Sequence, residues 1–318
     1  MKLGELTKYP KGLRVGGIFR IAKFEVKTAK NGKAYGDCLI SDHSHDVPAK
    51  YWDIPGDVVE LLQQNSILRI EAALDYFKES PQLTIDAVQV PTQQEIDESL
   101  QSLGLMAPRT IDDMVNQLQG IIAGIQHGGL RQMLLQVFVA DTALAAQFKR
   151  HPGAVRNHHA YIGGLLLHTL EVAETAADCC ARNDRINKDL LLTAALIHDI
   201  GKVREIEVDA LGLPVGFTKA GKLLRHINLG MEIVDQACRA AQVEEELSLI
   251  LKHCILSHHG QPEWGSPVEP MLLEAELLHY LDNLSAKTEQ FAREQERIEP
   301  GGFTKSFLLR RDVYRANF

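Results

Sequence analysis

Residues 12–90 alternate between apolar and polar positions with the two-residue period of β-strands. The apolar positions of the first strand keep one parity as far as Ile21 and take the opposite parity from Phe24 onward. This change of phase predicts a β-bulge near Ala22–Lys23, because a strand that bends around a small barrel needs one. The Asn31-Gly32 pair then predicts a hairpin turn with positive φ.

Further strands are predicted at 33–41 and 47–52, and again around 68–74 and 83–85. Between these pairs, Pro55–Gln64 favours a short helix, because proline suits the first turn of a helix. The resulting order of three strands, one helix and two strands is typical of the five-stranded OB-fold, a small barrel that binds oligonucleotides.

After Pro91 the apolar positions follow the period of helices. The predicted fold is therefore multidomain, with an all-β OB-fold barrel at 1–92 followed by an all-α region. Within that region we expect a linker and leading helices at 93–155, a helical domain at 156–300 and a C-terminal arm at 301–318. The later helical patterns cover 129–149, 161–182, 187–200, 228–241, 244–257 and 270–297.

Several histidines and aspartates lie in otherwise apolar helices. The segment 190–200 is apolar almost throughout, yet it ends in a His-Asp pair. Burying such groups is costly unless they have strong partners, and a divalent cation is one such partner. Imidazole and carboxylate groups both suit Mn, Fe, Zn or Ni. The candidate ligands in this setting are His168, His198, Asp199, His226, His258, His259 and Asp282.

The order H…HD…H…HH…D of these residues resembles that of the HD superfamily of metal-dependent phosphohydrolases. Four segments also look like the YhaM family of 3′–5′ exoribonucleases, which has an OB-type domain ahead of its HD domain. The resemblance covers nearly the whole chain and implies a metal-dependent phosphodiesterase that releases nucleoside monophosphates from single-stranded RNA or DNA. The segments are 158–165 (HHAYIGGL), 198–202 (HDIGK), 257–260 (SHHG) and 265–267 (GSP).

The resemblance also implies how two divalent metal ions would be held. Asp199 would bridge them, because the two oxygens of a carboxylate can serve two cations. The second ion would be held by His226 together with His258, His259 or both. Manganese is the first expectation for both ions, with Fe, Zn, Ni, Co and Mg as alternatives. The first ion would be held by His168, His198, Asp199 and Asp282.

Residues around these ligands carry further expectations. Gly164 stands where some superfamily members place a Glu for a third metal, so two ions are expected. Arg225 stands where a small residue is expected, and it either contacts phosphate or restricts access to the second ion. Lys202, one helical turn past the His-Asp pair, is expected to act in catalysis by neutralising charge in the transition state, with a salt bridge as the alternative. His158 and His159 either contact substrate or pack at a helix entry.

The barrel carries a weaker indication of nucleic-acid binding. The net charge of the chain is −8, yet residues 8–50 hold nine Lys or Arg against four Asp or Glu. OB barrels bind single strands by stacking bases on aromatic rings beside cations. Lys23, Tyr35 and Trp52 are therefore predicted to bind substrate, with a solvated surface as the alternative. Phe19 shares the parity of the core positions and is expected inside the barrel.

Three functions remain open at this point. The exonuclease is favoured, because a barrel that holds a strand would serve it. A phosphohydrolase acting on nucleotides or cyclic dinucleotides would use the same centre without needing the barrel. A non-catalytic nucleic-acid-binding protein with a structural metal is the third alternative.

Cellular location and assembly are constrained only loosely. The five cysteines form no CxxC pair, which favours reduced thiols in a cytoplasmic protein. No apolar run approaches the ~20 residues that span a membrane, and the first ten residues do not resemble a secretory signal. The amphipathic helices predicted at 110–149 can pack within the chain or between chains, so a homo-oligomer stays open.

Overall fold

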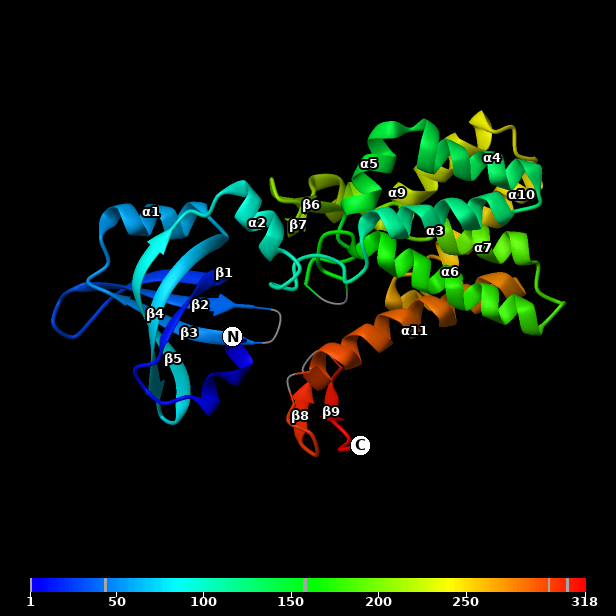
Figure 1. Ribbon diagram of the computed structural model, residues 1–318. Coiled ribbons are helices and arrows are strands. Elements are labelled where there is room, and N and C mark those ends of the chain that lie inside the picture. The colour runs from blue at the N-terminus through cyan, green and yellow to red at the C-terminus, as the bar shows by residue number, and fades with distance from the viewer. Residues whose placement is uncertain (1, 43–44, 157–158, 297, 307–308) are drawn as a thin grey trace. The chain divides into compact units, whose positions relative to one another are not determined.

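The computed structural model describes residues 2–42, 45–156, 159–296, 298–306 and 309–318. The chain divides into two compact units (Figure 1). Each unit has its own hydrophobic core. The first unit comprises Met1–Met106 with Glu296–Gly302 and Arg315–Phe318, and the second comprises Ala107–Gln295 with Phe303–Tyr314. Among the described residues, no helix combines the length and the apolar character that crossing a membrane would require.

The first unit contains a closed β-barrel in which the strands follow the order β1-β2-β3-β5-β4. All neighbouring strands are antiparallel except β3 and β5, which pair in parallel. The predicted all-β barrel, with its helix between the third and fourth strands, is thereby confirmed. Its elements are β1 (Arg14–Thr28), β2 (Ala34–Ser41), β3 (Asp46–Trp52), α1 (Gly56–Gln64), β4 (Ile67–Phe77) and β5 (Ser80–Gln89).

The predicted bend and turn of the barrel are both present. The pairing of β1 with β2 shifts register between Ile21 and Lys23, which is the predicted bulge. Gly32 has a φ of +84°, so it supplies the left-handed conformation that the β1–β2 turn needs. Phe19 is only 6% exposed and packs in the barrel core, as its parity predicted.

The second unit is helical, as predicted. Its helices pack around one apolar core. The helices α6 and α7 bury nearly all of their own apolar side chains in this core. The helix α2 (Gln93–Ser99) follows the barrel and belongs to the first unit. The second unit contains α3 (Ile111–Gly124), α4 (Gly128–Leu135), α5 (Thr142–Arg150), α6 (Gly164–Arg182), α7 (Lys188–Ile197), α8 (Lys202–Glu205), α9 (Lys219–Ala240), α10 (Glu245–Ser257) and α11 (Leu273–Glu296).

The structure differs from the predicted helical pattern in several places. The helix predicted over 129–149 is divided, because a π-helical turn at Gln136–Ala140 separates α4 from α5. The helix predicted over 228–241 already begins at Lys219 and is interrupted at Arg225. Two short hairpins were not predicted. They are β6 (Ile206–Val208) with β7 (Pro214–Phe217), and β8 (Phe303–Ser306) with β9 (Arg311–Tyr314).

Candidate metal centre

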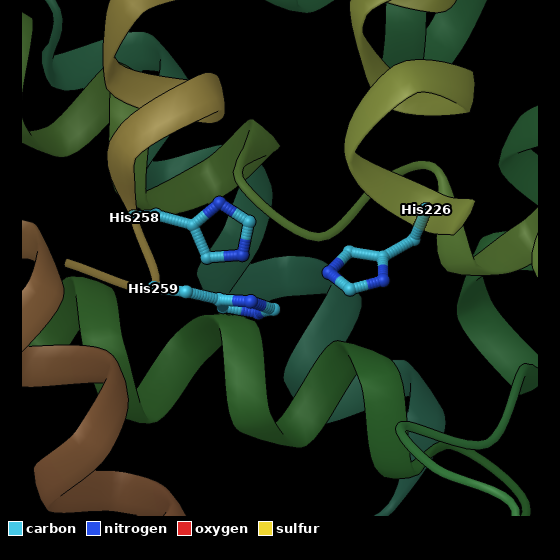
Figure 2. Close-up of side chains that lie close together, drawn as sticks. All are labelled: His226, His258 and His259. Carbon is cyan, nitrogen blue, oxygen red and sulfur yellow. The ribbon is translucent and has the colours of Figure 1, made fainter. Parts of the chain in front are cut away.

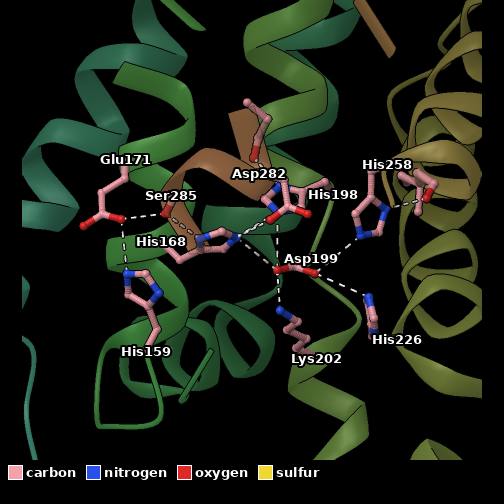
Figure 3. A network of polar contacts seen from close by, with 12 residues as sticks. His159, His168, Glu171, His198, Asp199, Lys202, His226, His258, Asp282 and Ser285 are labelled. Atoms are coloured by element: carbon pink, nitrogen blue, oxygen red, sulfur yellow. Dashed lines mark hydrogen bonds and ion pairs between the residues drawn. The ribbon is translucent and has the colours of Figure 1, made fainter. Parts of the chain in front are cut away.

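Asp199 lies at the point where helices from distant parts of the second unit converge (Figure 3). The His-Asp pair follows the C-terminal end of α7, and the pair His258-His259 follows α10. The helices α6, α9 and α11 contribute His168, His226 and Asp282. All seven side chains predicted as ligands fall into two groups of potential ligand atoms around Asp199.

The first group consists of His168, His198, Asp199 and Asp282. His168 Nε2 lies 3.4 Å from Asp199 Oδ2 and 3.1 Å from Asp282 Oδ1. His198 Nε2 lies 3.3 Å from the same oxygen of Asp199. Two imidazoles and two carboxylates therefore point at one small volume, with Asp199 contributing its Oδ2 atom.

The second group consists of His226, His258 and His259, whose rings face one another in Figure 2. His226 Nε2 and His258 Nε2 lie 3.5 Å and 3.7 Å from Asp199 Oδ1. The two oxygens of Asp199 thus face different groups, Oδ2 the first and Oδ1 the second. This is the arrangement that a bridging carboxylate requires.

The backbone explains why His226 can lie beside Asp199. A Cβ atom at Gly201 would come within 2.0 Å of the carbonyl oxygen of His226 and 2.5 Å of the Gly230 nitrogen. Only glycine allows the turn after Asp199 to approach α9 this closely. The glycine of the HDIGK segment therefore brings the second group to the carboxylate.

Three of the five histidines are oriented by backbone carbonyls. His198 Nδ1 lies 2.8 Å from the oxygen of Ala195, and His258 Nδ1 lies 2.6 Å from that of Ile255. His259 Nδ1 lies 2.9 Å from the oxygen of Trp264. A carbonyl only accepts hydrogen bonds, so Nδ1 carries the proton and the Nε2 lone pair is left to bind a metal.

The other two histidines are oriented by carboxylates. His226 Nδ1 lies 3.0 Å from Glu205 Oε2. His168 Nδ1 lies 2.9 Å from Ser285 Oγ, which in turn donates to Glu171 Oε2 at 2.6 Å. Carboxylates behind metal-binding histidines fix the ring and raise its basicity. Each of the five imidazoles thus has its Nδ1 atom engaged and its Nε2 atom near the centre.

The buried polar atoms of the centre fit a divalent cation. Asp199 Oδ1, His226 Nε2 and His258 Nε2 are buried and make no hydrogen bond to any residue that the structure describes. Leaving such atoms without partners in a protein interior is costly. A donor set of imidazole nitrogen and carboxylate oxygen suits Mn, Fe, Zn or Ni, so divalent ions would satisfy these atoms.

The protonation states of His258 and Asp199 also favour metal binding. Burial, together with the neighbouring His259, lowers the pKa of His258 well below its usual range, so its imidazole is neutral. Burial opposes the ionisation of Asp199, yet the charges of Lys202 and His198 hold its pKa well below the usual range. A neutral imidazole and an ionised carboxylate are the forms that ligate metals.

Lys202 and Arg225 both line a cavity of about 1020 Å³ that opens beside the centre. Lys202 Nζ lies 2.6 Å from Asp199 Oδ2, so the salt bridge considered as its alternative role is present. Arg225 has the unusual backbone angles φ 63° and ψ 161°, and its guanidinium lies over the ring of Phe217 at 5.7 Å. Both cations can therefore reach a phosphate that enters the cavity.

His159 occupies a different position. Its ring is fully buried, and Nε2 lies 3.1 Å from Glu171 Oε2. This histidine therefore contacts Glu171, which is joined to His168 through the hydroxyl of Ser285 (Figure 3). The geometry favours packing at the helix entry over substrate contact. His158 lies outside the described residues.

Two of the three barrel residues predicted to bind substrate lie side by side in the first unit. Tyr35 and Trp52 are paired across β2 and β3 with ring centroids 5.0 Å apart. Lys50 Nζ lies over both rings, at 5.3 Å and 5.2 Å. Lys23 instead pairs with Glu25 at 2.9 Å, so part of its charge is neutralised on the surface.

The supporting residues Glu171, Ser285 and Glu205 were not predicted. Glu171 follows His168 by three positions on α6, and Ser285 follows Asp282 by three positions on α11. This spacing places each of them one helical turn from a candidate ligand, so the signal was available in the sequence. No comparable spacing links Glu205 to His226, because hairpin β6–β7 intervenes.

Comparison with known families agrees with this geometry. Residues 165–287 match the family model for the HD domain. All seven clustered side chains lie within that range. HD domains are typically metal-dependent hydrolases, which accords with the donor set described above. The second unit of this chain therefore contains an HD domain, whose buried histidine–aspartate centre indicates divalent metal binding and a phosphohydrolase type of chemistry.

Proposed function

We propose that this protein is a metal-dependent phosphodiesterase that degrades single-stranded RNA, with single-stranded DNA as the alternative substrate, from the 3′ end to nucleoside monophosphates. The observation that carries the proposal is the position of Asp199, whose two oxygens face two separate groups of imidazoles. Such a carboxylate suits a pair of ions, and paired ions are the usual means of cleaving phosphodiesters.

The two groups of ligands define where the ions would lie. His168, His198 and Asp282 would hold one ion with Asp199. His226, with His258, His259 or both, would hold the other, which Asp199 would share. When bound, divalent ions polarise phosphoryl oxygens, lower the pKa of water and stabilise the leaving oxygen. Their hydrogen bonds to backbone carbonyls keep His198, His258 and His259 in the tautomer that this binding needs.

Other residues of the centre would act on the substrate directly. Lys202 lies beside Asp199 and lines the cavity, so its ammonium can stabilise the negative charge that develops on a phosphate during cleavage. Burial opposes the charge of Lys202, but Asp199 and Asp282 raise its pKa and keep it protonated. The cavity admits substrate on the side of His226, His259 and Asp282.

The barrel supports a polymeric substrate. Tyr35 and the half-exposed Trp52 form an aromatic surface with Lys50 over it. Stacking on an aromatic residue is worth ~1–3 kcal/mol per base, and a cation beside the rings adds attraction for the phosphate backbone. A mononucleotide would gain little from such a surface, whereas a strand would gain at each base.

Hydrolysis of end-labelled oligonucleotides tests the proposal. Protein with measured metal content is incubated with single-stranded RNA carrying a 5′ or a 3′ label, in Mn²⁺, Mg²⁺, Zn²⁺, Ni²⁺, Co²⁺ or Fe²⁺. Release of the 3′-terminal nucleotide as a 5′-monophosphate, with stepwise shortening of the 5′-labelled strand, is expected. The absence of hydrolysis from metal-loaded protein, with every one of these ions, would contradict the proposal.

A phosphohydrolase of nucleotides is the second candidate, because the cavity of about 1020 Å³ has room for a small ligand. The same assay includes nucleoside mono-, di- and triphosphates and cyclic dinucleotides as competitors. A preference for any of these over an oligonucleotide, by kcat/KM, would replace the exonuclease proposal with this one.

A further inference from the structure

An aromatic residue of the HD domain stands in the cavity beside the centre without a function so far. Trp264 is 54% exposed and lines the cavity together with His226 and His259. It ends the short turn η3 (Pro262–Trp264), which follows closely on the second group of candidate ligands. A tryptophan exposed inside a cavity presents a large aromatic face that a ligand can cover.

The position of Trp264 is fixed from two sides. Its carbonyl oxygen accepts a hydrogen bond from His259 Nδ1 at 2.9 Å. Its ring lies against that of His279, with centroids 5.6 Å apart, and His279 Nδ1 in turn donates to the carbonyl of His258 at 3.1 Å. The tryptophan is therefore tied to the side chain of His259 and, through His279, to the backbone carbonyl of His258.

The turn is also closely packed. Gly260 has a φ of +82°, and a Cβ atom there would lie 2.6 Å from the ring of His279. Any side chain at this position would push His279, and with it the ring of Trp264, out of place. The conformation of the SHHG segment thus holds an aromatic ring at a set place next to the second group of ligands.

The same cavity is lined by three further cationic side chains. Arg156, Lys222 and Arg225 line it, and none of them forms an ion pair with a carboxylate among the residues described. Three acidic residues also line the cavity. Glu205 and Asp282 are engaged by His226 and His168, and Glu263 is exposed on the turn η3. The strained backbone of Arg225 holds its guanidinium over Phe217 within this cavity, and such strain is concentrated at functional sites.

We propose that Trp264 is a stacking platform for the base of the nucleotide whose phosphate is cleaved, with Arg156, Lys222 and Arg225 binding backbone phosphates. This assignment rests on the proposed phosphodiesterase function. It adds the residue that would favour phosphodiesters that carry a nucleobase over those that do not. Because the carbonyl of Trp264 orients His259, a base stacked on the ring also steadies a residue of the centre. The platform is distinct from Tyr35 and Trp52 of the barrel.

Fluorescence can test the platform without hydrolysis, because the chain has only two tryptophans. In Trp52→Phe, Trp264 is the sole tryptophan, and in Trp264→Phe, Trp52 is. Adenosine 5′-monophosphate with Mg²⁺ is titrated into both variants. Saturable quenching is expected in Trp52→Phe, and much weaker quenching in Trp264→Phe. Equal quenching in the two variants, or none in Trp52→Phe, would overturn the assignment.

A pair of chromogenic substrates gives the second test. Thymidine 5′-(p-nitrophenyl phosphate) carries a base, and methyl p-nitrophenyl phosphate does not. In Trp264→Leu, which keeps the backbone carbonyl, kcat/KM for the nucleoside ester relative to the methyl ester is expected to fall about tenfold, through KM. Trp264→Phe restores part of this ratio because its ring still stacks. Phe303→Leu, which changes an exposed aromatic residue outside the cavity, leaves the ratio unchanged.

The outcomes separate the platform from the proposed function. Damage to His259 alone would slow both esters equally, so the ratio would stay constant and the platform would be excluded. Wild-type protein that degrades oligonucleotides while Trp264→Leu keeps the wild-type ratio contradicts the platform only. Wild-type protein that cleaves the nucleoside ester but no oligonucleotide contradicts the exonuclease proposal and leaves the platform standing.

Discussion

The barrel and the HD domain each contain a close lysine–carboxylate pair, and the surroundings of the two pairs are opposite. Lys23 lies 2.9 Å from Glu25, and these side chains are 64% and 46% exposed. Lys202 lies 2.6 Å from Asp199, and these side chains are 13% and 2% exposed. These two pairs therefore join similar groups at similar distances, but one pair is exposed to water and the other lies in the protein interior.

The difference shows which charges carry information about function. An exposed ion pair costs little to form and contributes roughly 0–1 kcal/mol, so its presence on a surface implies no ligand. A buried carboxylate loses its hydration, and that loss is large unless several partners compensate. Asp199 must therefore be explained by what surrounds it, whereas Lys23 need not be.

Replacing Asp199 is expected to have the largest effect. In Asp199→Ala, hydrolysis of single-stranded RNA falls by at least ~10²–10³-fold, because both groups of imidazoles lose the carboxylate between them. Binding of a labelled strand to the barrel stays within about twofold of wild type, since its ~1–3 kcal/mol per base comes from aromatic stacking. Hydrolysis is followed on gels and binding by fluorescence anisotropy.

The matched control is Asp178→Ala, which removes an exposed carboxylate from α6. It should keep wild-type hydrolysis and metal content. If Asp199→Ala loses its fold and its strand binding together, the metal is mainly structural, as in the non-catalytic alternative.

The stability of metal-free protein should depend on pH through His168. Burial opposes protonation of this ring, but Asp199 and Asp282 raise its pKa to about 9, above the ~6.5 of an unfolded histidine. The resulting stabilisation is complete below pH ~6.5 and is lost as the pH rises through about 9. Its size is on the order of 3 kcal/mol, so the Tm of chelator-treated protein falls by roughly 5–10 °C over this interval.

A His168→Asn variant provides the comparison. Its Tm should change much less between pH 6.5 and 9 after chelation. A wild-type Tm that is flat or rises over the same interval would mean that His168 is not protonated between the two aspartates.

Ser285 tests the connection between Glu171 and His168. Ser285→Ala removes the hydroxyl that joins them, and metal affinity is expected to fall about 10–100-fold, as for other partners of metal-binding histidines. Ser285→Thr keeps a hydroxyl and should recover most of this affinity. Calorimetric titration with Mn²⁺ or Zn²⁺ measures the metal affinity of both variants. A Ser285→Ala variant that binds metal as tightly as wild type would exclude an orienting role for the hydroxyl.

The barrel surface is expected to give the smallest effect. Trp52→Ala weakens binding of a single-stranded oligonucleotide by about tenfold, and the change persists in protein without metal. Phe77→Ala, which removes another exposed aromatic ring of the first unit, serves as its control. If Trp52→Ala binds the strand as wild type does, the aromatic surface of the barrel is not the strand-binding surface.

The sequence predicted the candidate ligands because burial makes them conspicuous. A histidine or aspartate within an apolar run needs an explanation, and the seven residues predicted as ligands all proved to cluster at the centre. The barrel could be predicted because the alternation of apolar and polar residues extends over many positions of its strands. Glu171 and Ser285 lay at helical spacing from ligands, but single Glu and Ser residues are too common for that spacing to be noticed.

Other features could not be predicted because they depend on tertiary packing. The break at Arg225 lies within an otherwise regular helical pattern, and only the approach of Gly201 to α9 explains why the chain turns near there. The hairpin β6–β7 has too few residues to show a period. Trp264 gave no pattern at all, because its importance comes from the cavity around it.

Anomalous diffraction from crystals grown with Mn²⁺ or Zn²⁺ tests the central claim most directly. We predict two peaks on either side of the Asp199 carboxylate, ~3.5–4 Å apart. One should lie next to His168, His198 and Asp282, and the other next to His226 with His258, His259 or both. A single peak away from Asp199, or none in crystals of protein with confirmed metal content, would contradict the account.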